Sequence, residues 1–172
     1  NGNNDAFVFK LENSGGFIWA VSFGGVLNES AISLSVDGLS NVYITGFYNG
    51  NIDFDPGAGV VNLQQAGGND IFVSKLSEAG IFIWAKSMGG NQQDVGFSSY
   101  ADYEGNIYTS GNFLGSGDFN PGGPYVALNA TGNADIYTSK LTNTGDYVWA
   151  KSVEFTGIDN NYSMAVDADG NI

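Results

Sequence analysis

Apolar and polar residues alternate over short stretches of this chain, and glycine-containing turns separate the stretches. Residues 71–76 are rich in apolar and β-branched side chains, and a turn at residues 77–80 connects them to a second apolar stretch at residues 81–88. Two such stretches joined by a short glycine-containing loop predict a β-hairpin, which Gly89 and Gly90 are expected to end. The same signals predict an all-β chain, with further strands at residues 96–101, 107–112 and 125–129.

The side chains of alternate residues point to opposite faces of a strand. A bulky face can pack into the small face of a neighbouring copy, and repeated units that cannot bury a core alone become stable together in this way. Within residues 81–88, Phe82, Trp84 and Lys86 are expected on a bulky face, and Ile83, Ala85 and Ser87 on a small one.

The hairpin sequence recurs along the chain. Residues 69–90 have close counterparts at residues 4–25 and 134–153, all in one register with a spacing of 65 residues. The chain therefore divides into a unit at 1–65, a unit at 66–130 and an incomplete unit at 131–172, about 2.65 copies. We interpret the recurring polar and aromatic positions as structural, because a unique site would not recur in every unit. They are Asp5, Asp70 and Asp135, Lys10, Lys75 and Lys140, and Trp19, Trp84 and Trp149.

The repeat length and strand count favour a β-propeller. Four short strands in a repeat of more than 40 residues are typical of a propeller blade, which is a four-stranded antiparallel sheet. A closed propeller has four or more blades. We therefore expect these units to be part of a larger propeller or assembly.

Three segments resemble one known family. They are NDIFVSKL at residues 69–76, WAKSMGG at residues 84–90, and the pattern Asp-x-x-Gly-Asn-Ile-Tyr at residues 102–108. These segments resemble the bacterial β-propeller repeats often labelled SBBP, and the DFDPG sequence at residues 53–57 is similar to variants in secreted proteins of Bacteroidota. The resemblance implies a propeller fold, an extracellular or cell-surface location and a type IX secretion setting. It implies no catalytic residues.

The composition of the chain excludes several classes of binding partner. The chain has 18 acidic residues and 5 basic ones, all lysine, for a formal net charge of −13. Such a surface repels phosphate backbones, so nucleic acid is not an expected partner. No stretch of 18 apolar residues occurs, so membrane insertion is not expected either. Cysteine is absent, which excludes disulfides and thiolate metal sites.

The DFDPG sequence is a candidate metal site. Side-chain oxygens of Asp53 and Asp55 are expected to converge beside a turn, as are those of Asp118 and Asn120 in the next unit. Such oxygens suit Ca²⁺. The alternative is a Pro-Gly turn that an Asp or Asn begins, with no ion.

Two other polar patterns have structural interpretations. The Asp-x-x-Gly-Asn segments beginning at Asp102 and Asp167 match a calcium loop only in part, and a hairpin turn explains them without an ion. Lys75 and its equivalents are expected to pair with a recurring carboxylate, and Asp70 is the nearest candidate in sequence.

The sequence favours a non-catalytic function. Histidine and cysteine are both absent, which removes the triad chemistries. We expect a structural or interaction module with a protein or glycan ligand, bound where the units differ, in the loops after Gly25, Gly90 and Val153. One alternative is a fibre subunit that self-associates through terminal edge strands such as residues 1–11. Another is a carbohydrate-binding or carboxylate-dependent glycoside-active propeller, with Tyr48, Tyr100 and Tyr103 as exposed rings for sugar stacking.

Overall fold

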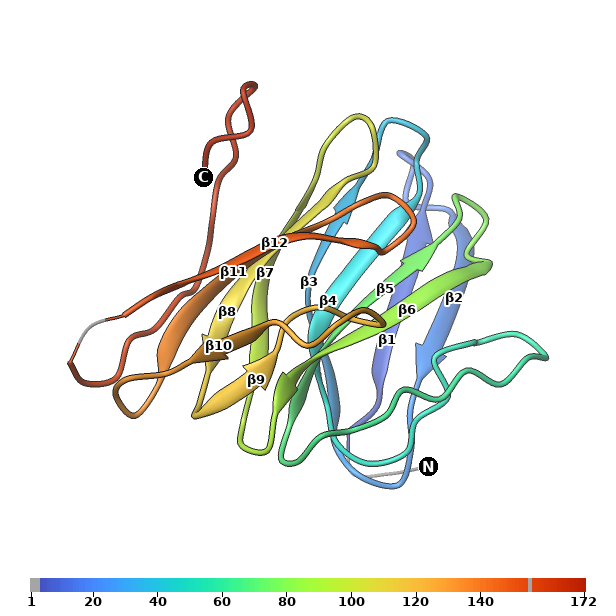
Figure 1. Ribbon diagram of the computed structural model, residues 1–172. Helices are drawn as coiled ribbons and strands as arrows, with labels where there is room; N and C mark the ends of the chain where they lie inside the picture. Colours follow the sequence, from blue (N-terminus) through green and yellow to red (C-terminus); the bar gives the residue numbers. More distant parts are fainter. Residues whose placement is uncertain (1–3, 155) are drawn as a thin grey trace.

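The computed structural model describes residues 4–154 and 156–172 (Figure 1). Within these ranges the chain forms strands and no helix, and hence no helix that could cross a membrane. Every ladder between strands is antiparallel, so the all-β prediction is confirmed. The strands are β1 (Ala6–Leu11), β2 (Phe17–Phe23), β3 (Glu29–Val36), β4 (Val42–Tyr48), β5 (Asp70–Leu76), β6 (Phe82–Gly90), β7 (Val95–Ala101), β8 (Ile107–Phe113), β9 (Ser116–Asp118), β10 (Ala127–Asn129), β11 (Asp135–Leu141) and β12 (Tyr147–Val153).

The strands form three sheets. A two-stranded sheet pairs β1 with β2, a central sheet has the order β10-β9-β6-β5-β4-β3, and a third sheet has the order β12-β11-β8-β7. Figure 1 shows β1 and β2 on one side of the central sheet and the third sheet on the other. Sheet boundaries are offset from the sequence units, because β3 and β4 of residues 1–65 pair with β5 and β6 of residues 66–130.

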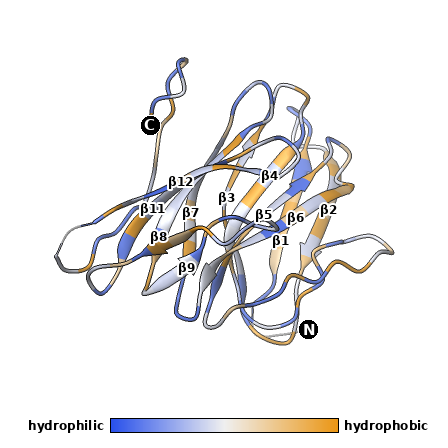
Figure 2. Ribbon diagram, in the orientation of Figure 1, coloured by the Kyte–Doolittle hydropathy of each residue, from blue (hydrophilic) through white to orange (hydrophobic). Residues whose placement is uncertain are grey.

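The central strands β4 and β5 are buried on both faces, and Figure 2 shows apolar segments along the central sheet. Ile44 and Phe72 pack against β1 and β2 in what we call the N-terminal core. Tyr43 and Val73, one residue along, face the third sheet in the C-terminal core. Each large apolar side chain buried in this way contributes about 1.5–3 kcal/mol. Double burial also explains why apolar residues occupy consecutive positions in both strands, as at Ile71–Val73 of β5.

A bulge in the β5–β6 hairpin places the side chains of β6 on different faces from those that the sequence predicted. Lys75 pairs with Trp84 and Leu76 pairs with Phe82, so Ile83 is skipped. Phe82 therefore packs against the N-terminal core and Trp84 against the C-terminal core. The prediction that both rings share one face was wrong, because an extra residue interrupts the period of two. The same shift follows Lys10 and Lys140 in the other two hairpins.

The sequence predicted that Gly89 and Gly90 would end the strand, and this prediction was wrong. The strand continues through Gly90, and residues 89–90 pair with β9. Gly89 has a φ of 137°, which a residue with a side chain rarely adopts. The strand thus acquires a partner from the segment after β8, and this segment gives the central sheet two extra short strands.

Candidate functional site

The Asp-x-x-Gly-Asn segments form closed turns, as does the equivalent segment at residues 37–41, where Ser40 replaces the glycine and has a φ of 63°. Asp37 Oδ1 accepts hydrogen bonds from the backbone N–H groups of Leu39 and Asn41, both at 2.9 Å, and Asp37 Oδ2 accepts one from Asn41 Nδ2 at 2.8 Å. Burial pushes the pKa of Asp37 upward, but these donors and the nearby Lys75 charge hold it below its usual value. Asp102 and Asp167 make the same three bonds. The hairpin-turn interpretation therefore accounts for the polar residues of this motif.

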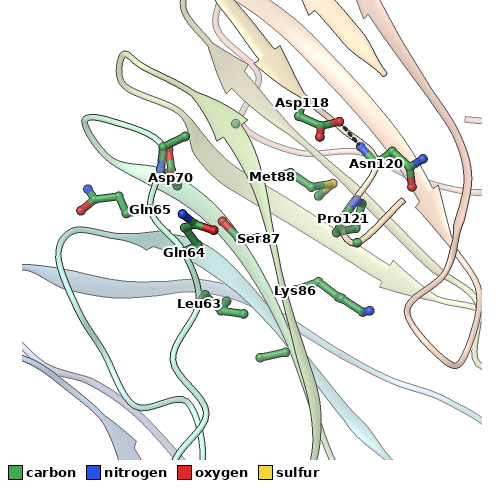
Figure 3. Close-up of a pocket in the computed structure, with 14 residues that line it drawn as sticks. Leu63, Gln64, Gln65, Asp70, Lys86, Ser87, Met88, Asp118, Asn120 and Pro121 are labelled. Atoms are coloured by element: carbon green, nitrogen blue, oxygen red, sulfur yellow. Dashed lines mark hydrogen bonds between the residues drawn. The ribbon is translucent and has the colours of Figure 1, made fainter. Parts of the chain in front are cut away.

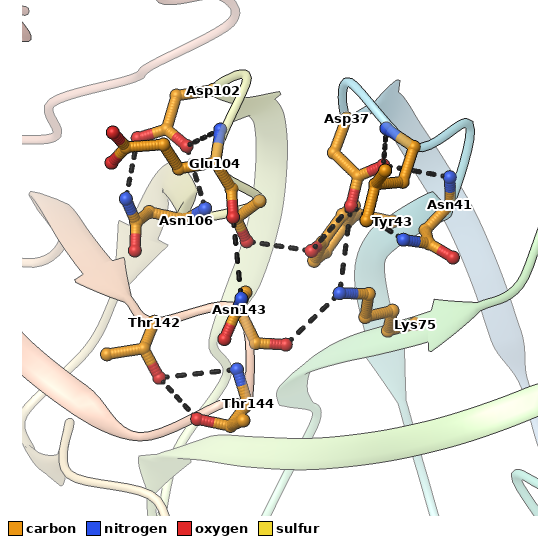
Figure 4. Close-up of polar contacts among 12 residues, drawn as sticks. Asp37, Asn41, Tyr43, Lys75, Asp102, Glu104, Asn106, Thr142, Asn143 and Thr144 are labelled. Carbon is orange, nitrogen blue, oxygen red and sulfur yellow. Dashed lines mark hydrogen bonds and ion pairs between the residues drawn. The ribbon is translucent and has the colours of Figure 1, made fainter.

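Lys75 lies at the junction of two sheets (Figure 4). Its Nζ is 3.7 Å from Asp37 Oδ2, donates to the carbonyl oxygen of Asn143 at 3.1 Å and lies 4.7 Å from the ring centroid of Tyr43. The prediction that Lys75 pairs with Asp70 was wrong. Asp70 begins β5, whereas Lys75 lies near the other end of that strand. Burial lowers the pKa of Lys75, and the Asp37 charge opposes that shift. A lysine held in this way is a structural cation.

Other recurring lysines and tryptophans also hold neighbouring hairpins together. Trp19 Nε1 donates to the carbonyl oxygen of Glu78, and Trp84 Nε1 to that of Asn143, both at 3.0 Å. Lys10 forms an exposed ion pair with Glu78 at 3.2 Å. Each acceptor lies in the turn of the next hairpin. These positions therefore join one sheet to the next, and Lys10 and Lys75 are each held by a neighbouring hairpin.

The DFDPG segment inserts its aromatic residue into a core. Phe54 is 1% exposed and packs 5.3 Å from the Tyr48 ring and 5.1 Å from the Phe72 ring. Its equivalent Phe119 is fully buried against Phe113 and Tyr137. The sequence analysis did not predict this role. The signal was the phenylalanine between two polar residues, which occurs at the same position in both units.

The flanking carboxylates hold the same loop. Asp53 Oδ1 accepts from the backbone N–H groups of Asp55 and Val61 at 3.0 and 2.8 Å, and Asp118 Oδ1 does so from Asn120 and Val126. Asp55 Oδ1 caps Gly57, and Asn120 Nδ2 donates to the Pro124 carbonyl oxygen. Residues 4–154 and 156–172 contain no group of three or more acidic side chains that could hold a metal. Ca²⁺ binding at these four residues stays a prediction.

A cavity of about 590 Å³ lies where the equivalent loop at residues 118–122 meets β6 (Figure 3). Its lining combines amides, a hydroxyl, two carboxylates and one ammonium group with a few apolar side chains. Asp70 lines it, is 1% exposed, and has one carboxylate oxygen, Oδ1, without a hydrogen-bond partner among the described residues. The principal lining residues are Leu63, Gln64, Gln65, Asp70, Lys86, Ser87, Asp118, Asn120 and Pro121.

Comparison with known proteins supports the fold at a coarse level. The chain is 27% identical over 195 residues to an uncharacterized WD repeat-containing protein of Acanthamoeba polyphaga mimivirus, which covers 97% of this chain and 14% of the relative. It is 26% identical over 145 residues to the regulatory protein FlaEY of Caulobacter vibrioides, across 84% of this chain and 15% of the relative. The chain thus spans about one seventh of the length of these relatives. No family model matches. A repeat fold of β-propeller-like type is the conclusion that the sheets and the WD-repeat relative support together.

The tyrosines expected to stack on sugars differ in exposure. Tyr48 is fully buried and its hydroxyl lies 2.8 Å from Ser87 Oγ, so it cannot be an exposed platform. Burial raises its pKa to about 12. Tyr103 is 85% exposed and Tyr100 is 37% exposed, with the Tyr100 ring 6.1 Å from that of Tyr108. Of these three tyrosines, only Tyr103 has a largely exposed side chain.

Proposed function

We propose that this chain is a non-catalytic interaction module of a secreted or cell-surface bacterial protein, in which a rigid propeller-type stack of sheets presents loops to a protein or glycan ligand. One observation carries the proposal. The recurring tryptophans and lysines are bonded to the next hairpin, as Trp84 is to Asn143. Trp19, Trp84 and Lys75 therefore build the scaffold, and we expect the specificity of recognition to come from residues that differ between the units.

The cavity at β6 is the recognition site that we favour. Gln64 and Gln65 line it, and the equivalent positions of the next unit are Asn129 and Ala130. Amide and carboxylate groups provide both donors and acceptors, and the side chains of Leu63 and Pro121 add apolar contact. This lining suits a polar ligand with hydroxyl or amide groups.

The same lining favours carbohydrate binding as a second candidate. A glycan array probed with the fluorescently labelled chain tests it, and a reducing-end assay on each bound glycan tests catalysis. We expect binding that Gln64→Ala with Lys86→Ala weakens at least tenfold, with Gln93→Ala outside the cavity as the matched control. Release of reducing ends would contradict a non-catalytic module. Equal binding by both variants would remove the cavity from the proposal.

A fibre subunit is favoured by the outer face of the β1–β2 sheet. Phe7 and Phe9 are 66% and 54% exposed, and their rings stack at 6.1 Å. Among the described strands, β1 pairs only with β2. Residues 1–3 of the predicted edge strand lie outside the described residues. Electron microscopy of the purified chain separates filaments, which support this alternative, from discrete particles, which do not.

A further inference from the structure

A pair of acidic residues recurs beside the first strand of each hairpin, with one member at or just before the start of that strand and the other in the segment that follows the hairpin. The backbone N–H of Asp94 donates to the carbonyl oxygen of Asn69 at 2.8 Å, which places Asp94 beside Asp70. The backbone N–H of Glu29 bonds in the same way to Asn4, the residue before Asp5, at 3.0 Å. Asp159 bonds to Ala134, the residue before Asp135, also at 3.0 Å. The pairs are Asp5 with Glu29, Asp70 with Asp94, and Asp135 with Asp159, and both members repeat with a spacing of 65 residues.

In the central sheet a glycine keeps open the space between the two carboxylates. Asp70 and Asp94 are each 1% exposed. A Cβ atom built on Gly89 would lie 2.6 Å from Asp94 Oδ2 and 3.2 Å from Asp70 Oδ1. The two oxygens therefore lie against the same glycine, in a space that any other residue would fill.

One oxygen of each pair lacks a donor. Asp94 accepts from the backbone N–H groups of Gly90 at 2.7 Å and Leu114 at 3.0 Å, and Asp70 Oδ2 accepts from Ala66 at 2.6 Å. Asp70 Oδ1 has no partner among the described residues, and neither do Asp135 Oδ1 and Glu29 Oε1. Asp135 is fully buried and Glu29 is 3% exposed. A buried anionic oxygen needs a positive or hydrogen-bonding partner, because desolvation without one is unfavourable.

We propose that each acid pair binds a hard divalent cation, with Asp70 Oδ1 and Asp94 Oδ2 as the anionic ligands in the central sheet. Carboxylate oxygens are preferred ligands of Ca²⁺ and Mg²⁺, and either ion completes its shell with water and backbone carbonyls. The cavity of about 590 Å³ reaches Asp70, and a second cavity of about 430 Å³ is lined by Asp5 and Glu29, so both sites have a route for hydrated ions. The net charge of −13 raises the local concentration of cations.

Ion stoichiometry tests the proposal. The chain is stripped with chelator, dialysed against CaCl₂ or MgCl₂ in separate arms, and analysed by elemental mass spectrometry. We expect bound ion in at least one arm and one ion fewer per chain in Asp94→Asn. Asp146→Asn, which changes an exposed turn outside both candidate ion sites, should retain the native count. Addition of the bound ion at about 100 times its Kd should raise the native melting temperature by at least about 5 °C.

A shared proton between the two carboxyl groups is the competing explanation. It predicts no retained ion, equal melting in chelator and in either salt, and greater stability of Asp94→Asn than of the native chain at pH 7; that result overturns the proposal. Circular dichroism checks that the variant is folded. If the variant is not folded, the native chain still tests the proposal. Ion binding to carboxylates should weaken severalfold between pH 7 and pH 5, and an absence of bound ion at pH 7 rejects the site.

Discussion

Lys75 Nζ lies 3.7 Å from Asp37 Oδ2, and the two side chains are only 8% and 3% exposed. The lysine comes from β5 and the aspartate from the β3–β4 turn, and the lysine also bonds to the Asn143 carbonyl of the third sheet. One ammonium group thus connects the end of the central sheet to its neighbour.

Removal of that charge should destabilise the protein. Lys75→Met leaves the buried Asp37 carboxylate without its cation, although backbone donors still compensate part of the cost. We expect the free energy of unfolding to fall by about 2–4 kcal/mol in urea titrations. Lys10→Met is the matched control, because Lys10 occupies the equivalent position but its ion pair with Glu78 is exposed at 32% and 65%, so the change should alter stability by less than about 1 kcal/mol. Equal losses in the two variants would refute the role of burial.

Trp84 joins the sheets by both packing and a hydrogen bond. Its ring meets Tyr43 at 6.0 Å, and its Nε1 donates to Asn143. Trp84→Phe keeps much of the ring and removes the donor, so we expect a loss of about 1 kcal/mol. Trp84→Ala should cost about 3 kcal/mol. Thermal and urea unfolding measure both, and a Trp84→Ala protein as stable as the native chain would sink the packing assignment.

Gly46 of β4 lies directly against the backbone of the neighbouring strand β3. Opposite it, β3 bulges between Ala31 and Ser33, and a Cβ at Gly46 would overlap the Ser30 carbonyl oxygen. The β3–β4 ladder would have to separate, so Gly46→Ala should cost more than about 2 kcal/mol. Gly16→Ala, beside the flexible Glu12 side chain, is the control and should stay within about 1 kcal/mol. Differential scanning calorimetry compares the two.

The Asp70 carboxyl gives stability a specific pH dependence in metal-free buffer. Burial, with a smaller contribution from the Asp94 charge, raises its pKa to about 6. Between about pH 4 and 6 the folded protein therefore keeps a proton that the unfolded chain has released, so the free energy of unfolding falls as pH rises through that window. The Asp70 share should be on the order of 1–3 kcal/mol. Asp70→Asn should flatten the profile, and a profile as steep as that of the native chain would reject this source.

Phe54 should matter more than the acidic residues beside it. Phe54→Ala empties part of the N-terminal core, and we expect a loss of about 3–5 kcal/mol. Asp55→Ala removes only the cap on Gly57 and should cost about 1 kcal/mol in chelator. The comparison is made by urea unfolding, with calcium added in a second series. A larger loss for Asp55→Ala in the calcium series alone would support the predicted ion at the loop.

The sequence predicted the β5–β6 hairpin and the stacking of similar sheets, because the apolar alternation and the recurring tryptophans are local signals. It failed at Ile83, where a bulge changes the face of every later residue, and bulges leave no fixed sequence mark. It also failed for Lys75, because Asp37 comes near only when β4 pairs with β5. The Asp70–Asp94 pair was missed although Glu29, Asp94 and Asp159 share the 65-residue spacing, because Asp94 comes beside Asp70 only through the long-range bond from its backbone to Asn69.

The contacts from Trp19 to Glu78 and from Trp84 to Asn143 both join residues 59 apart in the chain. Those from Lys10 to Glu78 and from Lys75 to Asn143 both join residues 68 apart. An in-frame duplication or loss of 65 consecutive residues would leave every such contact with a partner of the same kind. A gain or loss of any other length would instead change these spacings of 59 and 68 residues and mismatch the contacts.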